Sequence, residues 1–141
     1  MGYNFKKGKN YKEHYSGNNQ CAEKCAEKCE WVKNHNHEFL SSTDYAKDKE
    51  CIIHNHRIAG VTGPAIRCGN SHVHKIETFT DTFCGHFHSV CDTTGPAISL
   101  PGGKHIHLVK GETSVNDGHD HDYFFTTLIE DPTNVPNDKD C

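Results

Sequence analysis

The sequence predicts an all-β fold made of three tandem two-stranded repeats, with a short cysteine-rich helix in front of them. Twelve of the 13 histidines fall in six His-x-His pairs, which begin at intervals of 19, 18, 14, 19 and 14 residues. These intervals sort into a unit of about 33 residues that holds two pairs. From residue 34 onward, Val, Ile, Thr, Phe and Gly are frequent and turn dipeptides recur, as is typical of strands and turns.

Two ungapped alignments support the repeat. Residues 74–88 (HKIETFTDTFCGHFH) align on 107–121 (HLVKGETSVNDGHDH), and residues 54–66 (HNHRIAGVTGPAI) align on 86–98 (HFHSVCDTTGPAI). Each unit is therefore expected to hold two strands. The first-type strands carry the pairs that begin at His35, His72 and His105, and the second-type strands carry the pairs that begin at His54, His86 and His119. Turn residues precede most of the pairs, so each strand is expected to begin at its histidines. The first unit carries five extra residues in a loop around 44–50.

The chain divides into four segments by composition. Residues 1–19 are polar and aperiodic and predict a flexible arm, and residues 20–33 predict the helix, because Ala, Glu and Lys are good helix formers. The repeated β domain is expected over 34–130. A polar tail, 131–141, follows and ends in a cysteine.

Three cysteines of the predicted helix, Cys21, Cys25 and Cys29, stand at i, i+4 and i+8 and so share one helical stripe. This stripe is consistent with a three-thiolate metal site, with disulfides to another segment or subunit, or with a face that packs on the β domain. Cysteines four residues apart on one helix are poorly oriented for a disulfide with each other. Cys141 has no packing reason to end a polar tail, and we interpret it as a covalent tether.

The histidine pairs are expected to face the interior. In a strand, residues i, i+2 and i+4 share a face. The residue two positions after each pair is apolar or aromatic in six cases of six, and the residue between is polar in five of six. The six apolar positions are Phe39, Ile58, Ile76, Val90, Val109 and Tyr123.

Inward imidazoles need partners, because an unpaired buried polar group costs about 1–3 kcal/mol. Metal ions, other histidines, Thr hydroxyls and buried water are the alternatives. A His-x-His pair sets two imidazoles on one face about 6.5–7 Å apart, and a neighbouring strand brings more within chelating distance. An antiparallel, barrel-like meander would gather first-type pairs at one end and second-type pairs at the other, whereas a β-solenoid would stack each type in a ladder.

The candidate metal ligands are the twelve paired histidines and the three helix cysteines. They are His35, His37, His54, His56, His72, His74, His86, His88, His105, His107, His119, His121, Cys21, Cys25 and Cys29. The expected ion is Zn²⁺, with Cu²⁺ or Ni²⁺ as alternatives, because imidazole and thiolate suit these metals.

Composition excludes some classes of partner. A formal net charge of −4, which would become +9 with every histidine protonated, leaves no electropositive stripe for nucleic acid. No apolar run reaches the roughly 20 residues of a membrane helix, and the amino-terminal segment lacks the apolar region of a secretory signal. We therefore expect synthesis in the cytoplasm, with a spore coat or the extracellular space as a later destination.

Repeated GHxH-type pairs, GVTGPAI (60–66), TGPAISLPGGKHIH (94–107) and VNDGHDH (115–121) together resemble the YmaF family of small bacterial proteins from spore-forming Firmicutes. The resemblance covers roughly residues 34–129. It implies a repeated, histidine-bearing β domain and favours a coat or other assembled extracellular role, and it implies no activity.

Two hypotheses of function follow. The first is a non-enzymatic protein that binds transition-metal ions through clustered histidine pairs. The second is a self-assembling structural protein, a homo-oligomer or filament of a spore coat, cross-linked by cysteines. An enzyme is disfavoured, because a catalytic site normally occurs once and all six pairs persist here. A weaker alternative is a module that opens when its histidines become charged.

Overall fold

The computed structural model describes residues 34–133, and this part of the chain is all-β, as predicted. Every strand pairing in it is antiparallel, and its one helical element is a short 3₁₀ turn, η1 (Pro101–Gly103). Residues 34–133 contain no helix that is long and apolar enough to cross a membrane. The predicted arm, the predicted helix with Cys21, Cys25 and Cys29, and Cys141 lie outside the described residues.

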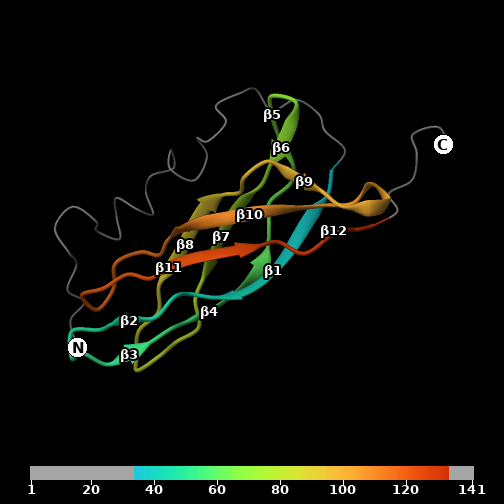
Figure 1. The fold of residues 1–141 in the computed structure, drawn as a ribbon. Coiled ribbons are helices and arrows are strands. Elements are labelled where there is room, and N and C mark those ends of the chain that lie inside the picture. Colours follow the sequence, from blue (N-terminus) through green and yellow to red (C-terminus); the bar gives the residue numbers. More distant parts are fainter. Residues whose placement is uncertain (1–33, 134–141) are drawn as a thin grey trace.

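Three antiparallel hairpins form the body of the fold (Figure 1). Hairpin I pairs β1 (Asn36–Ser42) with β4 (Arg57–Val61), hairpin II pairs β7 (Lys75–Phe79) with β8 (Ser89–Thr93), and hairpin III pairs β10 (His105–Glu112) with β11 (Asp122–Thr126). The hairpins contact one another in a cycle, because β4 contacts β7, β8 contacts β10, and β11 contacts β1.

Short strands extend both ends of the hairpins. At one end, β2 (Ala46–Lys47) pairs with β3 (Ile53–His54). Toward the other end, β5 (Ile66–Cys68) pairs with β6 (Ser71–Val73), β9 (Ala97–Ser99) pairs with β10, and β12 (Glu130–Asp131) pairs with β1. In Figure 1 the β2–β3 hairpin lies far from the end that carries β5, β6, β9 and β12.

The two expected arrangements of the strands, a barrel and a solenoid, are both corrected. No sheet closes into a barrel within the described residues, and no parallel ladder of the kind a solenoid requires occurs there. Neighbouring hairpins are instead joined by single backbone hydrogen bonds near their ends, as from Gly63 N to Lys75 O (2.9 Å) and from Gly95 N to Leu108 O (2.8 Å). Side-chain packing, not a continuous ladder, holds the hairpins together between these points.

The expected strand starts are also shifted. Four long strands begin one residue after their histidine pair, at Arg57, Lys75, Ser89 and Asp122. At these four places the second histidine of the pair still bonds across the hairpin, because its backbone N–H donates to a threonine side chain.

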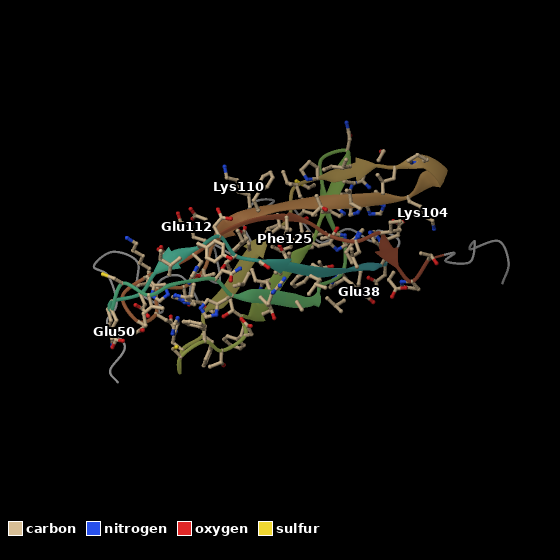
Figure 2. All side chains as sticks on the ribbon, turned by 60° about the horizontal axis from the view of Figure 1, so that its bottom comes forward. Glu38, Glu50, Lys104, Lys110, Glu112 and Phe125 are labelled. Atoms are coloured by element: carbon tan, nitrogen blue, oxygen red, sulfur yellow. The ribbon has the colours of Figure 1, made fainter. Side chains whose placement is uncertain are left out.

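The hydrophobic core is small and lies midway along the hairpins. It contains the six residues predicted from the alternation, together with Phe125, and each is at most 8% exposed. In Figure 2, Phe125 lies between Glu50 at one end of the molecule and Lys104 at the other. A central cluster of seven apolar side chains is small for a fold of this size, so polar interactions at the two ends must contribute to its stability.

Candidate metal centres

The histidine pairs form two clusters, one on each side of the core. The first cluster contains the first-type pairs: His35, His37, His72, His74, His105 and His107. The second cluster contains the second-type pairs: His54, His56, His86, His88, His119 and His121. This is the grouping expected for antiparallel strands. His37 and Thr43 are six positions apart along extended chain, and Thr43 is bonded to His56, so the clusters lie about 20 Å apart.

Candidate ligand nitrogens are close together in both clusters. One nitrogen from each of the six histidines of the first cluster lies within 4.8 Å of all the others. The second cluster contains two groups of four with the same property, and these share His56 and His119. Within the described residues no cysteine joins either cluster, and the free Cys51 and Cys84 are exposed.

Each cluster has two layers. The inner triads, nearest the core, are His37, His74 and His107 in the first cluster and His56, His88 and His121 in the second; all six are at most 1% exposed. The outer triads are His35, His72 and His105 in the first cluster and His54, His86 and His119 in the second.

Every inner histidine is fixed to a threonine on the opposite strand of its own hairpin. The backbone N–H of His37 donates to Thr62 Oγ1 (3.1 Å), and Thr62 N–H donates to His37 O (2.8 Å). The same two bonds recur at all six inner histidines, with Thr62, Thr94, Thr127, Thr43, Thr80 and Thr113 as partners. Each of these threonines is buried, at 1–6% exposure.

The inner rings are oriented by the next hairpin in the cycle. In the first cluster, Nδ1 of His37, His74 and His107 donates to the carbonyls of Leu128, Gly63 and Gly95 at 2.8–2.9 Å. In the second cluster, Nδ1 of His56, His88 and His121 donates to the carbonyls of Asp81, Ser114 and Asp44 at 2.7–2.9 Å. A carbonyl only accepts, so Nδ1 carries the proton and Nε2 of each neutral inner ring presents a lone pair.

The Nε2 atoms converge on a common centre. In the first outer triad, His35, His72 and His105 place their Nε2 atoms 3.0–3.1 Å from one another, and their ring planes cross at 88–90°. In the second, Nε2 of His54 lies 3.1 Å from that of both His86 and His119. An imidazole Nε2 offers one in-plane lone pair or one proton, so three mutually close Nε2 atoms cannot all be hydrogen-bonded to one another.

Several inner nitrogens have no hydrogen-bond partner at all. Nε2 of His74, His88, His107 and His121 is buried and unpaired. Folded proteins leave few buried polar atoms unpaired, and a bound cation satisfies lone pairs that have no hydrogen-bond donor. These four nitrogens therefore identify the centre of each cluster as a place where a positively charged ligand fits.

Burial keeps the imidazoles neutral. It lowers the pKa of His107 and His121 to about 4, although the bonds from their Nδ1 atoms to carbonyls favour the charged form. Burial and the neighbouring histidines lower the pKa of His72 and His86 to about 4 as well. At pH 7 these side chains are thus in the neutral form that metals bind.

Carboxylates lie near the outer triads. Glu130 Oε2 is 3.5 Å from His105 Nδ1 in the first cluster, and Asp117 Oδ2 is 3.9 Å from His86 Nδ1 in the second. Acidic groups behind metal-binding histidines are a common supporting arrangement.

The supporting threonines were not identified from the sequence as a set. Their signal is present nonetheless, because Thr62 and Thr94 occupy equivalent places in the two TGPAI segments. The partner carbonyls carry no signal of their own, since any residue supplies a carbonyl.

The fold and these centres define a class, that of histidine-rich all-β proteins with two six-imidazole clusters. A family model described as "YmaF: Spore germination protein GerY/YamF" matches residues 32–129. The chain belongs to this family, as the resemblance predicted. No curated protein and no solved structure matches the chain.

Proposed function

We propose that the protein is a non-enzymatic transition-metal binder that holds one ion at the centre of each histidine cluster. The observation that carries this proposal is the convergence of Nε2 lone pairs whose direction is fixed by Nδ1 hydrogen bonds to backbone carbonyls. Holding the far side of a ligating ring in this way is a standard feature of metal-binding histidines.

Other occupants satisfy these nitrogens less well. A water molecule donates two hydrogen bonds, and a single proton satisfies one pair of nitrogens. A metal cation attracts all the lone pairs at once. It also removes the cost of leaving buried acceptors unpaired, which is about 1–3 kcal/mol for each.

The ligand set restricts the metal. Neutral imidazole suits Zn²⁺, Cu²⁺, Ni²⁺ and Fe²⁺, and the sequence favours Zn²⁺ with Cu²⁺ or Ni²⁺ as alternatives. If all six imidazoles of a cluster bind, no position is left for a substrate, in contrast to catalytic sites, which keep one open. This consideration supports a storage, sensing or structural role over catalysis.

Metal analysis of the untagged full-length chain tests the proposal. We expect two equivalents of a first-row transition metal per chain and a lower melting temperature after prolonged treatment with EDTA. His14, which belongs to no pair, provides a matched control, and H14A should keep both equivalents. Absence of stoichiometric metal, together with a melting temperature that EDTA leaves unchanged, would contradict the proposal.

We also propose that the three hairpins represent three tandem repeats of one ancestral unit. The support is the recurrence of the His–Thr bonds in each hairpin and the cyclic order of the Nδ1 bonds. A hairpin alone would supply only two of the six histidines of each cluster, which gives a physical reason for three units.

Self-assembly is the second candidate function. Large apolar side chains on the outward strand faces favour it, with Leu40 70%, Phe124 65% and Ile53 62% exposed. The family description, spore germination protein, is compatible with an assembly in the spore. Non-reducing gels and size-exclusion chromatography of the full chain test this candidate, and a monodisperse, reduced monomer at high concentration would contradict it.

A further inference from the structure

The arrangement of the two layers in each cluster specifies a coordination geometry. In the first cluster, each outer ring packs edge-on against two inner rings, at centroid distances of 4.7–5.2 Å. His35 contacts His37 and His74, His72 contacts His74 and His107, and His105 contacts His37 and His107.

This contact pattern is that of two staggered triangles. In an octahedron, each corner of one face adjoins two corners of the opposite face and lies across the centre from the third. An eclipsed prism would instead place each outer ring over one inner ring. The contacts therefore place His35 across from His107, His72 across from His37, and His105 across from His74.

The second cluster has the same staggered pattern. His54 contacts His56 and His121, His86 contacts His56 and His88, and His119 contacts His88 and His121. Two clusters built from different residues and different loops thus share one arrangement of rings.

Distances between the nitrogens agree with the pattern. For a metal–nitrogen bond of about 2.1 Å, neighbouring donors lie about 3.0 Å apart in an octahedron and about 3.4 Å apart in a tetrahedron. The first cluster has Nε2 separations of 3.0 and 3.1 Å, including the 3.1 Å between inner His37 and outer His105. In the second cluster the values are 3.1, 3.1 and 3.3 Å, and its nitrogens lie within 4.8 Å of one another in two overlapping groups of four, where the first cluster has one group of six.

We propose that each cluster binds its ion in a six-coordinate, all-imidazole octahedron and that this geometry selects Ni²⁺, Co²⁺ or Fe²⁺ over Zn²⁺ and Cu²⁺. The inference rests on the proposed metal-binding function and refines its choice of ion. Zinc gains nothing from its filled d shell in an octahedral field and is usually four-coordinate in proteins, and Cu²⁺ favours tetragonal sites. The carbonyls and threonines that fix the rings keep the site from relaxing toward four ligands.

X-ray absorption and visible spectroscopy of the full chain, stripped of metal and reloaded with Co²⁺, test the geometry. We expect six nitrogen neighbours for each Co²⁺ and the weak visible bands of octahedral cobalt. Four neighbours and the intense bands of tetrahedral cobalt would overturn the octahedron while leaving the proposed function intact. Failure to take up any of Co²⁺, Ni²⁺ or Zn²⁺ would overturn both.

Competition between Ni²⁺ and Zn²⁺ tests the selectivity. With both ions offered in equal excess, the native chain should retain Ni²⁺, and a chain that retains Zn²⁺ overturns the selectivity. H72A removes one outer ligand from the first cluster. It should weaken Ni²⁺ binding there by more than the roughly tenfold to hundredfold that loss of a supporting residue costs. H14A is the matched control, and unchanged Ni²⁺ affinity in H72A would contradict a six-ligand site.

Discussion

The two clusters have the same inner construction and differ in how they are covered. The outer triad of the second cluster is buried, with His54, His86 and His119 only 2–4% exposed. In the first cluster the three outer histidines are half-buried. The His–Thr bonds that set the ligand positions are common to both, so geometry and access to solvent have separate structural origins.

The tighter cover comes from local turns. Cys84-Gly85 and Asp117-Gly118 adopt positive φ values and close two-residue turns directly before His86 and His119, as Asp-Gly does in hairpins. Phe83 stacks on His54, with ring centroids 4.5 Å apart and planes 4° from parallel. At the first cluster Glu130 of β12 contacts His105, and no such turn directly precedes His105. We therefore expect the two centres to hold the same ion with different rates of exchange.

Acid should lower the stability of the folded chain more than any other change, and it should act through both clusters. Burial lowers the pKa values of histidines in each cluster below the unfolded value of 6.5, to about 4 for His72 and His107 in the first and for His86 and His121 in the second. The unfolded chain binds more protons, so stability is fully present above pH 6.5 and falls as the pH drops toward 4. The loss is about 1.4 kcal/mol per pH unit for each histidine that stays neutral.

Urea unfolding of the metal-free chain at pH 7.5 and pH 5 measures this loss. Glu130 faces the first cluster, and Asp48, Asp81 and Asp117 face the second, and these carboxylates moderate the loss at both ends. Equal stability at the two pH values would mean that the histidines of the folded chain take up protons as readily as those of the unfolded chain, and this would contradict the prediction.

Removal of one inner histidine should have the next largest effect. H107A and H121A each delete a buried ring and one ligand, and each should abolish one of two metal equivalents and lower the unfolding free energy by about 3 kcal/mol. Metal content and urea unfolding measure the two effects. If both variants lost both ions, the centres would not be independent.

The threonines that bond to the inner histidines should contribute equally to the stability of the two clusters. T113V and T127V keep the side-chain volume and leave the backbone N–H of His121 or His107 without its acceptor, so each should cost about 2 kcal/mol. Thermal unfolding of both variants with metal bound measures this cost. A large difference between them would show that the inner layers are not equivalent.

The two clusters should also differ in how fast they release metal, and this is the smallest energetic effect that we expect. A chelator should remove the ion of the first cluster before that of the second, in two phases. F83A uncovers His54 and should speed the slow phase about tenfold, equivalent to about 1.4 kcal/mol in the barrier. F79A changes a half-exposed aromatic residue of hairpin II and serves as the control. A single phase in the native chain would contradict the difference in cover.

Much of the fold was predictable from local rules. The two-residue period of a strand places Phe39, Ile58 and Val109 on the same face as the histidines before them, and all three are buried. The antiparallel alternation of pair types then predicts two separate clusters. Barrel closure was not predictable, because the same alternation permits hairpins that meet side by side without a continuous ladder.

The sequence by itself determined which residues face inward and which pairs share an end, because side-chain direction in a strand depends only on position along the chain. Only the tertiary structure decided how the imidazoles meet. The contacts that stagger the triads join residues as far apart as His37 and His105, and the carbonyl that orients His37 belongs to Leu128, 91 residues away. A local pattern cannot specify how these rings are oriented toward one another, since their orientation arises from the packing of three hairpins against one another.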